Sequence, residues 1–132
     1  MEEANAAIGA AVSTGSLPAE LETLLAEIQY ELLDLTEGNP VTPDRLRRAL
    51  RELGPVDVPR GFAVLGGVSD AAGLLKLARA ITRRVAREQG REYLGLLADV
   101  LLVVAWRAEE HAEVQVPLGL CLDVVRPTPR SY

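Results

Sequence analysis

Aromatic and sulfur-containing residues are scarce in this chain of 132 residues, which holds one Phe, one Trp, three Tyr, one Cys and one Met. The lone Cys121 excludes an internal disulfide and fits a reducing cytoplasm. His111 is the only histidine, so we expect no metal site. No aromatic residue interleaves the basic residues of the 76–87 segment, so stacking on nucleic-acid bases is not expected either.

Basic residues are also fewer than acidic residues. Lys and Arg number 14 against 19 Asp and Glu, a net charge of −5, which argues against nucleic-acid binding. The N-terminus carries Glu2 and Glu3 instead of a basic and apolar signal segment. The most apolar run, residues 94–106, is interrupted by Asp99 and falls short of the ~20 residues that span a bilayer. We therefore expect a cytoplasmic protein with no membrane or nucleic-acid partner.

What the chain does contain is Leu, Val and Ala at helical spacing. Apolar residues make up 48% of the sequence and few are aromatic, which is typical of packed helices. The spacing and the capping residues predict helices over residues 3–12, 16–36, 42–51, 69–90 and 93–110. They predict an all-α, five-helix, four-helix-bundle-like up-and-down bundle over residues 1–112.

The end of the chain changes character after Ala112. Apolar residues alternate there with polar or small ones, from Val114 to Leu122. Alternation is the pattern of a half-buried strand. Residues 113–132 are therefore expected to form a short extended or β-like C-terminal tail, in which Cys121 is packed.

A basic stripe runs along the fourth expected helix. Lys76, Arg79, Arg83 and Arg87 fall in one sector because residues three and four apart are neighbours on a helix. No acidic residue occurs between Asp70 and Glu88. Two interpretations stay open. The cations form surface or interface ion pairs, each contributing ~0–1 kcal/mol when exposed, or they form an anion site, because guanidinium groups match phosphate geometry.

Five further residues are candidates for a structural or a binding role. Asp99 interrupts an apolar run and is expected to form a structural ion pair with an arginine of the preceding helix. Phe62 either packs in the hydrophobic core or faces a ligand. Gly66 and Gly67 form a plain turn or cradle phosphate at a helix start. Glu2 is a solvated terminal charge or pairs with an arginine across a subunit interface. No Ser/His/Asp or Cys/His constellation is available, so no catalytic residue is assigned.

Five segments in order resemble motifs of one enzyme family. They are Asn-Ala-Ala-Ile-Gly at 5–9, Ile-Gln-Tyr-Glu-Leu at 28–32, Gly-Phe-Ala-Val-Leu-Gly-Gly at 61–67, the arginine-rich 78–87, and Tyr-Leu-Gly-Leu-Leu-Ala-Asp at 93–99. Together they resemble the ATP:corrinoid (cob(I)alamin) adenosyltransferases of the propanediol-utilisation type. The resemblance extends over roughly residues 2–110.

The resemblance implies a five-helix bundle that works as a homotrimer, with sites between subunits for ATP and cobalamin. It implies that Arg79 and Arg83 face the triphosphate, and the basic stripe adds Arg87 and Lys76 as candidates for the same anion site. It also implies that Phe62, with the glycine pair 66–67, faces the corrinoid, and that Glu2 pairs with Arg79.

The sequence departs from the family pattern where the family contacts ATP. Gly95 and Leu96 stand where the family has Asn and Arg, and its N-terminal phosphate loop has no counterpart here. Each lost charged hydrogen bond costs roughly 1.5–3 kcal/mol. We therefore expect a divergent, catalytically impaired member of the family that keeps a partial anion site and acts as a binding or assembly protein. The alternatives are an active adenosyltransferase and a purely structural helical interaction module.

Overall fold

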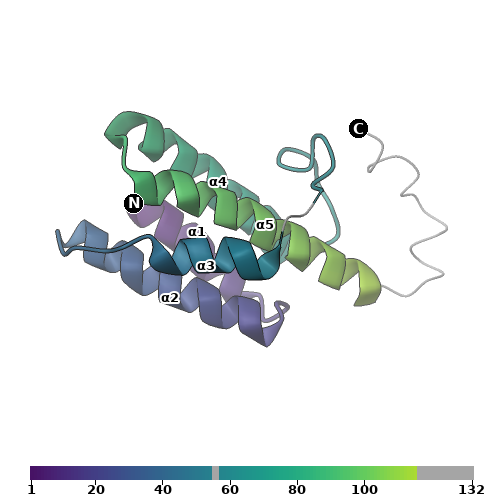
Figure 1. The fold of residues 1–132 in the computed structure, drawn as a ribbon. Coiled ribbons are helices and arrows are strands. Elements are labelled where there is room, and N and C mark those ends of the chain that lie inside the picture. The colour runs from purple at the N-terminus through teal and green to yellow at the C-terminus, as the bar shows by residue number, and fades with distance from the viewer. Residues whose placement is uncertain (55–56, 116–132) are drawn as a thin grey trace.

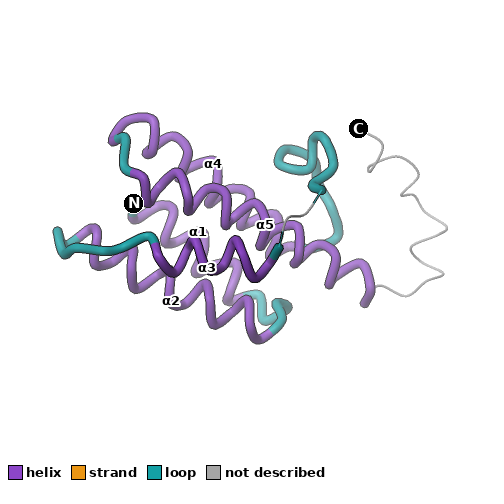
Figure 2. The backbone as a smooth tube through the Cα atoms, viewed as in Figure 1, coloured by secondary structure: helices purple, strands orange, loops and turns teal. Residues whose placement is uncertain are grey.

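The computed structural model describes residues 1–54 and 57–115, which consist of helices and connecting loops (Figures 1 and 2). There are five helices within these ranges: α1 (Glu2–Ser13), α2 (Ala19–Thr36), α3 (Asp44–Leu53), α4 (Asp70–Gln89) and α5 (Glu92–Gln115). The all-α bundle expected from the helical spacing is confirmed. The expected strand-like tail, with Cys121, lies outside the described residues from position 116 onward.

The core lies between α1, α2, α4 and α5. Helix α1 packs on α2 and α4, α4 packs on α5, and α3 packs on α5 (Figure 1). One face of α5 is buried, and it includes Leu94, Leu97, Ala98, Leu101, Val104 and Ala105. Full burial of a large aliphatic side chain contributes about 1.5–3 kcal/mol, so this stripe holds α5 in place.

Both predicted ends of α4 are confirmed. The Ser69 hydroxyl accepts a hydrogen bond from the backbone N–H of Ala72 at 2.9 Å, as an N-cap residue does. The helix stops at Gly90, which adopts the left-handed conformation with φ 66°. These two residues set where α4 begins and ends.

The starts of α2 and α3 differ from the prediction. Helix α2 begins at Ala19 after Pro18, without a side-chain cap, and the Ser16 hydroxyl lies 2.9 Å from the Thr14 hydroxyl, to which it is hydrogen-bonded. Helix α3 begins at Asp44 after Pro43, again without a side-chain cap, and runs to Leu53. In both cases the residue before the helix is a proline, whose ring restricts φ to the helical range.

Helix α5 is longer than expected. It starts at Glu92 and continues past Glu110 to Gln115, so residues 113–115 are helical and do not belong to an extended tail. No glycine or proline occurs between Gly95 and Pro117, so nothing in the covalent chain stops the helix at Ala112. The helix end predicted at residue 110 is therefore too early.

Polar contacts set how the helices meet. The side-chain amides of Asn5 and Gln29 each donate to the other residue's backbone carbonyl, at 3.3 and 3.2 Å. A Cβ at Gly9 would lie 2.9 Å from the Gln29 amide nitrogen, so the glycine leaves room for this approach. Two of the segments that resemble the enzyme family thus pack against each other between α1 and α2.

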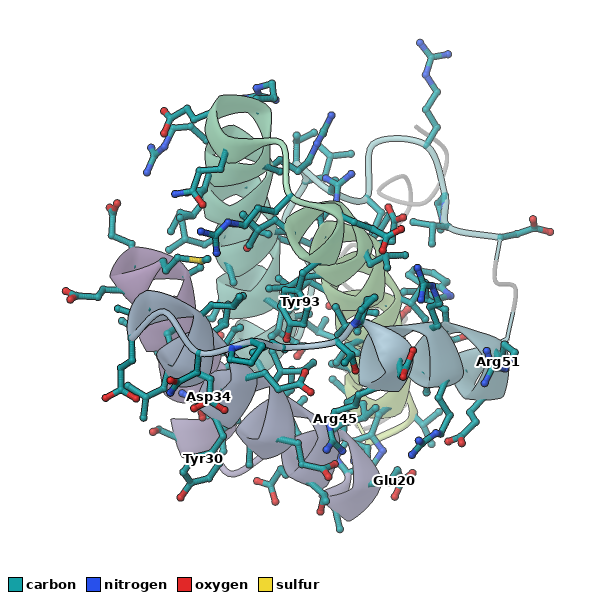
Figure 3. The ribbon with its side chains drawn as sticks, turned by 60° about the vertical axis from the view of Figure 1, so that its left-hand side comes forward. Glu20, Tyr30, Asp34, Arg45, Arg51 and Tyr93 are labelled. Carbon is teal, nitrogen blue, oxygen red and sulfur yellow. The ribbon has the colours of Figure 1, made fainter. Side chains whose placement is uncertain are left out.

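A second polar cluster joins α2, α3 and α5. The Tyr93 hydroxyl donates to Glu31 at 2.8 Å, and Arg45 donates to Glu31 at 3.2 Å while also pairing with Glu27. Figure 3 shows Arg45 between α3 and α2 and Tyr93 inside the bundle. Burial and the hydrogen bond with Glu31 raise the pKa of Tyr93, so its hydroxyl stays protonated.

Candidate functional site

An open depression of about 370 Å³ lies between α4 and α5. It is lined by Arg79, Arg83, Ala86 and Arg87 of α4 and by Gly95, Ala98 and Asp99 of α5. We call it the arginine depression. The four-residue spacing of the arginines aligns them on one side of α4, and the tight turn at Gly90 brings the start of α5 alongside.

The three arginines of this depression are not neutralised by close acids. None of them forms an ion pair with another described residue, and the buried Nε of Arg79 has no hydrogen-bond partner among them. Burial and the positive charge of Arg83 both lower the pKa of Arg79, while Asp99 opposes them. An anion seated here would relieve the repulsion between guanidinium groups and satisfy their donors.

Small residues leave the floor of the depression open. Gly95, Ala86 and Ala98 place at most a methyl group there. A Cβ added at Gly95 would meet nothing within 4 Å, so the space above it is free. The described lining residues therefore supply guanidinium donors and one carboxylate, and none of them carries a hydroxyl, thiol or imidazole. This set of groups suits the binding of an anion better than covalent catalysis.

Asp99 does not form the close ion pair expected of it. Its side chain is exposed and makes no salt bridge with a described residue. The reason is that Asp99 lies on the outward face of α5, together with Gly95 and Leu102, and not on the buried face of this helix. It acts on Arg79 at longer range, at the edge of the arginine depression.

Glu2 lies away from the arginine depression. It is exposed in the first turn of α1 and lines a different depression together with Gln89 and Arg91. The acid of α1 that reaches α4 within the chain is Glu3, whose carboxylate lies 3.1 Å from Nη2 of Arg84. Pairing of Glu2 with Arg79 across a subunit interface stays a prediction.

Lys76 is separated from the three arginines. Its ammonium group donates to the Leu65 carbonyl at 2.6 Å and lies 4.0 Å from the centre of the Phe62 ring. Phe62 is only 5% exposed and meets Trp106 edge to face, with ring centres 5.0 Å apart. The structure therefore places Phe62 in the core, with Lys76 covering it, and the basic stripe divides into two parts.

The glycine pair lies beside a buried carboxylate that the sequence analysis did not single out. Glu109 is fully buried and accepts hydrogen bonds from the backbone N–H groups of Val68 at 2.9 Å and Ser69 at 3.1 Å. A Cβ at Gly67 would lie 2.4 Å from its Oε1, whereas one at Gly66 would meet nothing within 4 Å. The anion at the start of α4 is thus the protein's own side chain.

One signal in the sequence marks Glu109. It follows Leu101 and Ala105 at intervals of four, so it continues the buried face of α5. A charged residue in such a position needs a partner. The partner, the backbone at residues 68 and 69, is about 40 positions away and becomes evident only in the fold.

Across residues 1–54 and 57–115, no group of three or more His, Cys, Asp or Glu is arranged to hold a metal ion. In the same residues, no helix is both long enough and apolar enough to cross a membrane.

Neither a protein-family model, nor a curated protein, nor a solved structure matches this chain. The resemblance to the corrinoid adenosyltransferases therefore rests on the five sequence segments alone. The arginine depression is the candidate site that the geometry defines independently of that resemblance.

Proposed function

We propose that this protein binds a phosphate-bearing ligand in the arginine depression. The observation that supports this most directly is the convergence of Arg79, Arg83 and Arg87 on one open depression, without an ion-pair partner among the described residues. Guanidinium groups bind phosphate oxygens with two parallel hydrogen bonds. A purely structural module would leave the three charges unexplained.

The resemblance to the adenosyltransferases makes ATP the first ligand to test, and a corrinoid the second. Gly95 adds no side-chain donor to the site, and Phe62 is held in the core. Both features support a protein that retains the anion site and has lost efficient transfer of the adenosyl group. In this proposal the protein is a divergent relative of the family that binds its ligand as a homotrimer, with a neighbouring subunit closing the open side of the depression.

Isothermal titration of the full chain with ATP and with inorganic tripolyphosphate tests the proposal. Because a charged hydrogen bond contributes about 1.5–3 kcal/mol, Arg79→Ala and Arg83→Ala should each weaken tripolyphosphate binding by about tenfold or more. Arg84→Ala is the matched control, since Arg84 is on the same helix but pairs with Glu3 and lies outside the depression. Its affinity should stay near that of the parent protein.

Three results would contradict the proposal. One is the absence of any binding heat with both ligands, and the second is an equal loss in the Arg84→Ala control. The third is robust formation of adenosylcobalamin from ATP and reduced cobalamin, which would identify an active transferase. Sedimentation of the same samples, with and without ligand, measures the oligomeric state.

A further inference from the structure

A second depression, of about 600 Å³, adjoins the arginine depression. It is lined by Leu50, Arg51 and Gly54 at the end of α3, by Val58, and by Asp99, Leu102 and Val103 of α5. We call it the aliphatic depression. Asp99 lines both depressions, so one carboxylate marks the border between them.

One continuous face of α5 forms the floor of both. Gly95, Asp99 and Leu102 follow each other at steps of four and three, which keeps them on the same side of the helix, and Val103 lies next to them at the edge of this face. From Gly95 to Val103 this face is about 12 Å long at 1.5 Å per residue. A single elongated ligand can therefore contact the arginines at one end and the aliphatic side chains at the other.

The aliphatic depression differs in chemistry from its neighbour. Four of the described residues that line it are aliphatic, namely Leu50, Val58, Leu102 and Val103, and none of the described lining residues is aromatic. Leu102 and Val103 are half-buried, so part of their apolar surface still faces solvent. The absence of a lining ring removes the usual platform for a nucleobase, and the aliphatic lining favours a hydrocarbon body.

Charge sets the direction in which such a ligand would lie. The Asp99 carboxylate repels a phosphate that approaches the aliphatic depression, whereas three guanidinium groups attract it on the other side. Arg51, near the end of α3 (Figure 3), is the one cation among the described residues that line the aliphatic depression. The phosphate end is therefore expected at the arginines and the apolar end beyond Asp99.

We propose that the ligand is an organic phosphate or diphosphate with an aliphatic body, bound along α5 with its phosphate at Arg79 and Arg83 and its hydrocarbon against Leu102 and Val103. This inference rests on the proposed function and deepens it by naming the class of ligand. It assigns a binding role to Leu102 and Val103, which neither the motifs nor the basic stripe singled out.

Titration calorimetry with three matched probes tests the inference. Geranyl diphosphate carries both ends of the expected ligand, inorganic pyrophosphate only the anionic end, and geraniol only the apolar end. We expect geranyl diphosphate to bind about tenfold or more tightly than pyrophosphate, because burial of apolar surface adds to the phosphate contacts. Geraniol should bind more weakly than either.

Two variants of α5 distinguish the loss of the aliphatic contact with the ligand from a general effect of replacing a valine on this helix. Val103→Asn should weaken geranyl diphosphate by about tenfold, since it removes an apolar wall, and leave pyrophosphate within about twofold. Val114→Asn is the matched control, because Val114 is an exposed valine of the same helix that lines neither depression. It should change neither affinity.

The outcomes distinguish this inference from the proposed function. If pyrophosphate binds and Arg83→Ala weakens that binding by about tenfold or more, but geranyl diphosphate binds no more tightly than pyrophosphate, the aliphatic inference is overturned and the anion site stands. ATP binding more tightly than geranyl diphosphate also overturns it. If none of the phosphates binds, both proposals fail.

Discussion

The carboxylate of Glu109 occupies the space into which a side chain at Gly67 would project, with only 2.4 Å between its Oε1 and an ideal Cβ at that position. The same carboxylate accepts two backbone N–H groups at the start of α4. The positive end of this helix is thereby compensated from within the protein. An external anion would therefore bind at the arginines, which lie nearer the other end of α4.

Gly67→Ala is expected to destabilise the fold. The added methyl group must displace a fully buried carboxylate that holds two hydrogen bonds, and overpacking of this kind costs about 1–3 kcal/mol. Urea unfolding measures the change in the free energy of unfolding. Gly66→Ala is the matched control and should be neutral or slightly stabilising, because nothing lies within 4 Å of its Cβ. Equal effects of the two variants would contradict the contact.

Phe62→Ala should reduce stability by about 3–5 kcal/mol, the usual cost of removing a buried aromatic ring. Thermal unfolding checks this, with the exposed Val64→Ala in the same loop as control. A small loss of stability combined with a large loss of corrinoid binding would instead support the ligand-facing role that the sequence resemblance implies.

Tyr93→Phe should cost about 1.5–3 kcal/mol near neutral pH, because it removes a hydrogen bond to the Glu31 carboxylate. The pKa of Tyr93 is raised in the folded state, so its contribution is complete below the unfolded value of about 10 and is lost as the pH rises above that value. The stability difference between parent and variant should therefore shrink above about pH 10.

Denaturant titrations from neutral to alkaline pH measure this difference. Tyr30→Phe serves as the control, since Tyr30 is 72% exposed and points away from the bundle (Figure 3). A Tyr93→Phe difference that stays constant across the alkaline range would rule out the proposed linkage.

Asp99→Asn should strengthen the binding of inorganic tripolyphosphate by about threefold, because it removes a negative charge from the edge of the arginine depression. Glu88→Gln makes the same change of charge on α4 at an exposed position that does not line the depression. Calorimetry should show a smaller gain for this control. A loss of affinity in Asp99→Asn would mean that the carboxylate organises the arginines instead of opposing the anion.

The sequence by itself determined the local features of this protein. A 3.6-residue repeat of leucine and alanine is sufficient to predict the five helices. Ser69 and Gly90 mark the ends of α4, because the preference of serine for the start of a helix and of glycine for its end depends only on neighbouring residues. The alignment of Arg79, Arg83 and Arg87 follows from the same repeat. The end of α5 was misjudged because alternating residues are a weaker signal than the absence of a helix breaker.

Only the tertiary structure decided which of these residues share a site. The repeat places Lys76 beside the arginines, yet packing directs it to Phe62 and the Leu65 carbonyl. Packing also brings Gly95 and Asp99 opposite the arginines and seats Glu109 against Gly67. Contacts between residues tens of positions apart depend on how the helices dock, and docking is set by the summed burial of many side chains and not by any local pattern.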